Sequence, residues 1–153
     1  MVGTGITDEE LADVVRHNRD AAAAYMRGDM DRYLALIHHA RGHTLLSPFG
    51  EGPTRYDGRD EDLRGAEPFI EAGEAELEQV EAHAWGDTLV LVMIERQNAR
   101  VGGLPDQDWS LRVTQVFRRD GAGWLLVHRH ADPLVRPVDL ERAAALARGA
   151  DRT

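Results

Sequence analysis

The chain has 153 residues, a length typical of one domain with its own core. It contains no cysteine and no lysine, which excludes disulfides, thiol catalysis, cysteine-ligated metals and lysine Schiff bases. The formal net charge of −9 disfavours nucleic acid and anionic membranes as partners. The first residues lack a basic segment followed by an apolar run, and no apolar stretch approaches the ~20 residues of a membrane helix, so we expect a cytoplasmic protein.

Two helices are predicted in the first quarter of the chain. Thr7 is a good N-cap, and Glu10 completes a capping box at the start of a helix over residues 8–27. Gly28 ends that helix, because glycine tolerates the left-handed conformation found at helix C-termini. A second helix is predicted to follow at once, over residues 30–38.

The middle of the chain predicts a short strand over residues 43–48 and a long loop over 49–65. Loops of that length are usually functional or mobile, so we expect this one either to fold over the mouth of the cone or to be a mobile connection. A short helix is predicted over residues 67–72. Alternating or continuous apolar residues then predict strands over 74–85 and 88–99.

The stretch from Trp109 to Pro133 predicts a long hairpin, with strands over 109–119 and 124–131. Asp120-Gly121-Ala122-Gly123 supplies the turn, because aspartate and glycine favour tight turns. Four antiparallel strands therefore follow one another as a meander, and a last helix is predicted over residues 140–148. The predicted fold class is α+β, with N-terminal helices packed across a curved antiparallel sheet and a cone-shaped cavity between them.

Two segments resemble a known superfamily. The stretch YMRGDMDRYLALI (residues 25–37) resembles the break between the first two helices of the nuclear-transport-factor-2-like superfamily, and GAGWLLVHRHADP (residues 121–133) resembles the last strand of its SnoaL-like branch. The resemblance implies one SnoaL-like domain over residues 1–153, with a core over about 8–133, a cone-shaped ketosteroid-isomerase-like barrel and dimerisation through the outer sheet face. The superfamily includes isomerases, epoxide hydrolases, polyketide cyclases and non-catalytic binding modules, so fold does not settle function.

Pairing arithmetic predicts one row of polar side chains across three neighbouring strands. A turn centred on Gly121-Ala122 places Arg112 roughly opposite His130, and the preceding connection places Glu95 roughly opposite Arg112. If this row faces the cone, Arg112 would bind a carboxylate or an enolate-like oxygen. His130 would transfer a proton, and Glu95 would orient Arg112 or act as a base. The resemblance implies the inward orientation, since an arginine in the corresponding strand of a related branch points into the pocket. The alternative is a solvated ladder of ion pairs on the outer face.

Four further residues complete the predicted site. His128 and Asp132 share a face with His130 and are candidate ligand contacts. They could also form a metal edge together with residues elsewhere, but no metal motif supports one, and we predict neither a metal nor a cofactor. Tyr25 could supply a phenol, and Trp109 is a candidate for stacking on a ligand, although most tryptophans at strand ends belong to a core or an interface.

The predicted function is binding of a small organic ligand in the cone, with proton transfer as the chemistry of any turnover: isomerisation, cyclisation or dehydration. The alternative is a non-catalytic homodimeric binding or interaction module whose polar row is structural. The predicted partners are a small ligand and a second copy of the chain.

Overall fold

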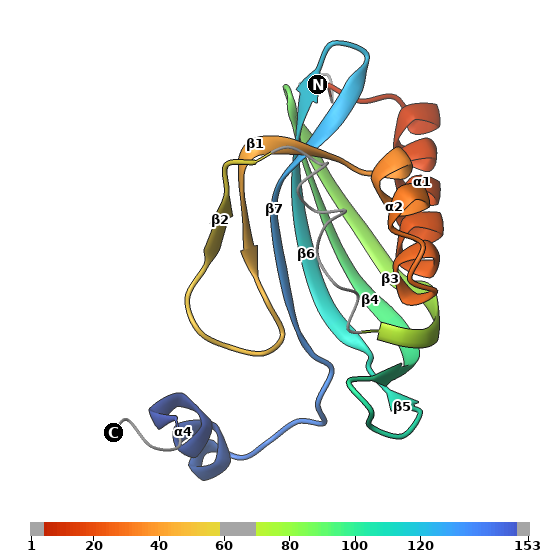
Figure 1. Cartoon of the computed structure of the whole chain (residues 1–153). Coiled ribbons are helices and arrows are strands. Elements are labelled where there is room, and N and C mark those ends of the chain that lie inside the picture. The colour runs from red at the N-terminus through yellow and green to blue at the C-terminus, as the bar shows by residue number, and fades with distance from the viewer. Residues whose placement is uncertain (1–4, 59–69, 150–153) are drawn as a thin grey trace.

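The computed structural model describes residues 5–58 and 70–149, and shows a curved sheet with helices against one face (Figure 1). The elements in chain order are α1 (Asp8–Met26), α2 (Met30–Leu36), β1 (His38–Leu46), β2 (Thr54–Tyr56), β3 (Ile70–Trp85), β4 (Thr88–Val101), β5 (Gln107–Asp108), β6 (Leu111–Asp120), β7 (Gly123–Pro133) and α4 (Leu140–Arg148). This arrangement confirms the predicted α+β class. Part of the predicted loop over 49–65 and of the predicted helix over 67–72 lies outside the described residues.

The first helix begins and ends as its capping residues predict. The Thr7 hydroxyl accepts a hydrogen bond from the Glu10 backbone N–H at 3.1 Å, and the Glu10 carboxylate accepts one from the Thr7 N–H at 2.8 Å. Gly28 has a φ of +77°, which lets the chain leave the helix without steric cost. The second helix is shorter than predicted, because Ile37 turns into an extended conformation and is buried in the core.

Within the described residues the strands form one sheet in the order β2-β1-β7-β6-β4-β3, with β5 paired to β4. Strands β3, β4, β6 and β7 pair antiparallel in succession, which confirms the predicted meander. Strand β1 lies parallel to β7 and begins at His38, five residues before the predicted start. The predicted helix over 67–72 is wrong for its last three residues, because Ile70 and Ala72 pair with β4 as the start of β3.

The core fills the space between α1 and the concave face of the sheet. Strand β4 supplies alternate buried side chains at Leu89, Leu91 and Met93, which are at most 2% exposed. Phe117 on β6 and Leu126 on β7 extend this apolar layer. The alternation fixes which residues of β4 face the helices, and Glu95 and Gln97 continue the same inward row.

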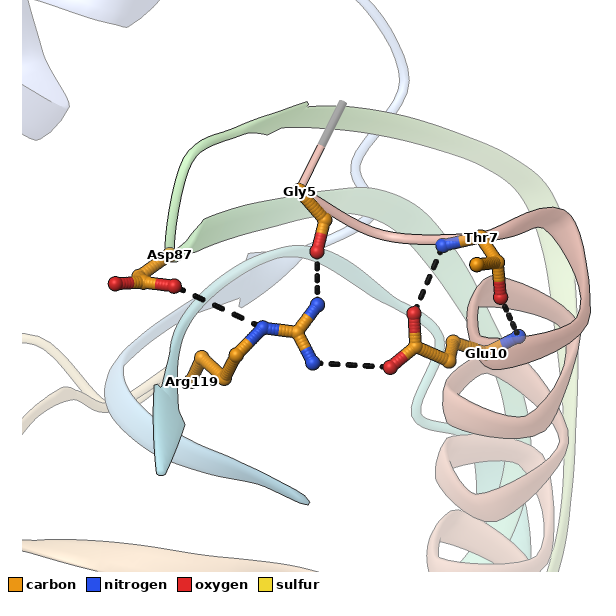
Figure 2. Close-up of polar contacts among 5 residues, drawn as sticks. All are labelled: Gly5, Thr7, Glu10, Asp87 and Arg119. Carbon is orange, nitrogen blue, oxygen red and sulfur yellow. Dashed lines mark hydrogen bonds and ion pairs between the residues drawn. The ribbon is translucent and has the colours of Figure 1, made fainter. Parts of the chain in front are cut away.

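Arg119, near the end of β6, fastens the start of α1 to the sheet (Figure 2). Its guanidinium donates to the Glu10 carboxylate at 2.9 Å and to the Gly5 carbonyl, and it lies 3.7 Å from the Asp87 carboxylate. The same guanidinium stacks 4.5 Å from the centre of the Trp124 ring. One arginine thus holds the helix N-terminus, the β3–β4 turn and β7 together.

Helix α4 begins after the Asp139 cap and ends at Gly149, as predicted. It stands apart from the sheet in Figure 1, and its Leu140 and Leu146 side chains are 85% and 64% exposed. None of the helices in the described ranges is both long and apolar enough to pass through a bilayer.

The contact with Arg119 predicts a pH-dependent contribution of Glu10 to stability. The Arg119 hydrogen bond, assisted by the Thr7 N–H, lowers the pKa of Glu10 from 4.5 to about 2. A carboxyl with a depressed folded-state pKa stabilises the fold above its unfolded pKa and loses that contribution as the pH falls through its folded pKa. We expect Glu10→Gln to lower the free energy of unfolding by a constant amount near neutral pH, and the loss to shrink between about pH 4.5 and 2. Denaturant titrations across this range test it. Glu9→Gln is the control for removing a carboxylate from the same turn, and a pH-independent effect of Glu10→Gln would contradict the assignment.

Candidate functional site

The observed strand pairing differs from the prediction in two places. Glu95 lies opposite Leu111, and Ile94 lies opposite Arg112, so β4 and β6 are shifted by one residue from the predicted register. Strand β7 contains a bulge: Val116 pairs with His128, whereas Phe117 pairs with Leu126. The bulge inserts one extra residue into β7 and reverses which of its side chains face inward beyond that point.

The predicted row of Glu95, Arg112 and His130 is therefore wrong. A one-residue shift sends Arg112 to the face opposite Glu95, where its side chain is 60% exposed. His130 lies opposite Thr114 rather than Arg112, on the same outer face. The residue of β7 that reaches Glu95 is Arg129.

A cavity of about 450 Å³ opens between α1, α2, β1 and the concave face of the sheet. Most of its wall is apolar, with Tyr25, Trp109 and Glu95 of the predicted site among the residues that line it. A volume of this size lies within the range of small-molecule sites. Polar side chains converge on it from β1, β4, β6 and β7, so the concave face is apolar with a small polar centre.

The polar centre is an ion pair between Glu95 and Arg129. Both terminal guanidinium nitrogens of Arg129 donate to the two carboxylate oxygens of Glu95, each at 2.8 Å. The Glu95 side chain is 5% exposed and that of Arg129 is 21% exposed. Burial opposes the charge on Arg129, but the attraction and hydrogen bonds of Glu95 outweigh it and leave the pKa of Arg129 above its ordinary value.

Amides from β4 and β6 flank this pair. The Gln97 side chain donates to the Glu95 carboxylate at 2.8 Å, which further fixes that carboxylate. Gln115 lies directly opposite Arg129 and is 4% exposed. Its side-chain oxygen has no hydrogen-bond partner among the described residues, and neither has the indole N–H of Trp109. Buried polar atoms are rarely left without partners, so these two atoms of cavity-lining residues call for an explanation.

An aromatic series runs along one wall. Neighbouring rings of Tyr25, Tyr33, His39, His43 and Tyr56 have centroids 5.4, 5.7, 4.7 and 5.0 Å apart in that order. The Tyr33 hydroxyl lies 3.2 Å from a His39 ring nitrogen. Burial raises the pKa of Tyr25, so its phenol stays protonated near neutral pH and can donate a hydrogen bond.

His43 is held in one tautomer by the backbone. Its Nδ1 lies 3.2 Å from the Ala40 carbonyl oxygen, which can only accept, so Nδ1 carries a proton and, in the neutral ring, the lone pair is on Nε2. An irregularity in β1 between His39 and Thr44 brings both histidines to the cavity. Gly42, with a φ of +78°, allows this turn in the strand.

The remaining predicted residues lie outside the cavity. Asp132 is 3.2 Å from His130 and 3.6 Å from Arg112, and all three side chains are more than 40% exposed. They border a shallow hollow on the outer face of the sheet. His128 instead contacts the Thr44 hydroxyl at 2.6 Å. Within residues 5–58 and 70–149, no three histidine or carboxylate side chains lie close enough together to hold a metal ion.

The sequence model of the SnoaL-like domain matches residues 14–135. The chain belongs to this family. No curated protein has a sequence that matches the chain significantly. The fold is that of the nuclear transport factor 2-like superfamily, as several solved structures show.

Three of those structures indicate the spread of the superfamily. A candidate dehydratase from Streptomyces avermitilis is 23% identical, with a TM-score of 0.67, and the match covers 84% of this chain and 99% of that one. A kinase hub domain from S. rosetta is 19% identical, with a TM-score of 0.63 over 80% and 95% of the two chains. A candidate aromatic ring hydroxylase from Novosphingobium aromaticivorans is 15% identical, with a TM-score of 0.62 over 84% and 89%. At these identities the likeness establishes the fold alone.

Several residues of this SnoaL-like site were missed by the sequence analysis. Gln97 and Gln115 occupy positions where the alternation of β4 and β6 requires inward-facing side chains, and that pattern could have identified them. Gly42 inside a strand is a recognised sign of an irregularity. The bulge that turns Arg129 inward has no comparable sign, because Val127 and His128 are ordinary strand residues.

The buried ion pair predicts a strong dependence of stability on Arg129. We expect Arg129→Met to lower the free energy of unfolding by about 3 kcal/mol, because it leaves the Glu95 carboxylate buried without its cation. Adding Glu95→Met should recover most of the loss, since apolar residues of similar volume replace a buried pair at little cost. Denaturant titrations give the free energy of unfolding of the wild type, of Arg129→Met and of the double variant. Glu78→Gln breaks an exposed pair with Arg96 of similar length and should have a much smaller effect. An equally small effect for Arg129→Met would contradict a buried pair.

Proposed function

We propose that this protein binds a small organic molecule in the cavity and catalyses proton transfer on it, as an isomerase, cyclase or dehydratase. The observation that carries the proposal is the group of polar side chains aimed into an otherwise apolar cavity of about 450 Å³. Convergent polar groups in an apolar pocket of this size are the usual signature of a ligand site.

Stability alone does not explain this polar centre. A buried ion pair gains little over well-packed apolar residues, because two charges must leave water. The orphaned side-chain oxygen of Gln115 and the orphaned N–H of Trp109 each carry a desolvation cost with no hydrogen bond to offset it. Polar groups that cost stability on their own are expected where a ligand satisfies them.

The proton-transfer chemistry rests on His43 and Tyr25. The Nε2 of His43 carries a lone pair and can take a proton from a bound molecule, because Nδ1 is committed to the Ala40 carbonyl. The protonated phenol of Tyr25 can donate to the oxygen on which negative charge develops. Glu95 is engaged with Arg129 and Gln97, which suits it to positioning more than to abstracting a proton. A dehydration, isomerisation or cyclisation needs one such base and one such donor.

We also propose that the protein is a homodimer that associates through the outer face of the sheet. On this face Val90 pairs with Val116, and Val92 follows Val90 two residues along β4, so these three valines lie close together on the outer face. Val92 is 41% exposed on it. Apolar patches of this kind are typical of protein interfaces. Arg112 and His130 would form part of the polar rim of that interface.

A pair of histidine substitutions tests the catalytic proposal. We expect His43→Gln to abolish turnover of cyclic ketones or hydroxy-ketones while ligand binding persists, because the amide cannot act as a base at this position. His130→Gln is the matched control, since His130 lies on the outer face and should leave both unchanged. Substrate depletion followed by chromatography measures turnover, and the ligand-induced shift in the unfolding temperature measures binding. Equal loss of turnover in both variants would place the chemistry elsewhere.

The dimer proposal predicts that a charge on the outer face of the sheet halves the molecular mass in solution. Val92→Arg should convert a dimer of the wild-type chain into a monomer, because it places a charge within the apolar patch. Light scattering coupled to size-exclusion chromatography measures the mass, and Glu74→Arg on the outermost strand is the control for added charge. A wild-type monomer would refute the proposal.

A further inference from the structure

We infer that the ligand of the cavity is an uncharged molecule with an apolar body, whose polar end donates a hydrogen bond to the side-chain oxygen of Gln115. This inference rests on the proposed small-molecule function and specifies the chemical class that the site selects. It depends on the charge balance of the cavity and on the position of the unpartnered amide.

The cavity is electrically balanced by its own residues. Among the described residues that line it, Glu95 and Arg129 carry the formal charges, and they cancel. Both carboxylate oxygens of Glu95 already accept hydrogen bonds from Arg129. An anionic ligand would have to compete with Glu95 for that guanidinium inside a chain of net charge −9, and a cationic ligand would have to compete with Arg129 for Glu95.

Gln115 supplies the recognition that the ion pair does not. It stands between Leu91 on β4 and Arg129 on β7, so its amide lies in the floor of the cavity beside the neutralised pair. Its oxygen is buried and unpartnered, and therefore requires a donor such as a hydroxyl or an amide N–H from the ligand. A site built to hydrogen-bond such a group discriminates strongly against an analogue that lacks it.

Trp109 indicates where a second polar group of the ligand would lie. Its indole N–H is also unpartnered and requires an acceptor. The Trp109 ring packs edge-on against Phe49, which lines the cavity and is nevertheless 63% exposed. This contact places Trp109 near the solvent-exposed opening of the cavity. The ligand's hydrogen-bond donor would therefore point toward Gln115, and its acceptor would point toward Trp109 at the opening.

Calorimetric titration with three probes of one skeleton tests the inference: naphthamide, naphthoate and methylnaphthalene. We expect the wild-type protein to bind naphthamide at least about tenfold more tightly than the other two, because it alone is neutral and carries a donor. Gln115→Leu should remove the advantage of naphthamide over methylnaphthalene. It should also raise the unfolding midpoint of the ligand-free protein, since it deletes a buried group without a partner, whereas a structural role for Gln115 would lower that midpoint.

Glu95→Gln provides an independent arm that keeps the shape of the site and leaves the charge of Arg129 uncompensated. We expect this variant to bind naphthoate at least about tenfold more tightly than the wild type does. Glu78→Gln, on an exposed ion pair outside the cavity, is the control for loss of one carboxylate and should leave that affinity unchanged.

The outcomes separate the two proposals. Naphthoate binding as tightly as naphthamide in the wild type, or no gain for naphthoate in Glu95→Gln, would overturn the inference and leave a small-molecule site standing. Failure of all three probes to bind the wild type would overturn the proposed function and this inference together.

Discussion

The ion pair between Glu95 and Arg129 is the constraint on which the site depends. It joins β4 to β7 across β6, and its 2.8 Å contacts require both side chains to face the concave side. Glu95 meets this requirement through plain alternation along β4, because it follows Leu89, Leu91 and Met93 at intervals of two residues. Arg129 meets it only because β7 contains an extra residue. The bulge is therefore what builds the polar centre of the cavity.

Much of the fold was predictable because its signals are local. The capping box at Thr7, the Gly28 terminator and the turn at residues 120–123 act within a few residues, and each was read correctly. The failures came where tertiary contacts override local preference. Residues 70–72 resemble the end of a short helix, but pairing with β4 makes them a strand, and burial of Ile37 ends the second helix early.

The site was less predictable, because a side chain's face depends on counting residues without error across two connections. A shift of one residue between β4 and β6 moved Arg112 to the outer face, and the bulge did the same for His130. In the structure Tyr25, Trp109 and Glu95 line the cavity, and none of them lies on β7, where the bulge changes which side chains face inward. The sequence of a strand does not by itself say which of its two alternating sets of side chains faces the core. A single bulge exchanges the two sets and so decides which side chains line the cavity.

The two faces of the sheet therefore have different chemical roles here, although both carry an arginine beside a carboxylate. On the outer face Asp132 contacts both Arg112 and His130, and all three side chains are half-exposed, so water screens and weakens each pair. On the inner face Arg129 is shielded from water, so its interaction with Glu95 is strong and the loss of either partner is costly. The same residue types can thus form an interface rim on one side and a selective pocket on the other. Solvent exclusion, more than residue identity, makes the inner set the better candidate for chemistry.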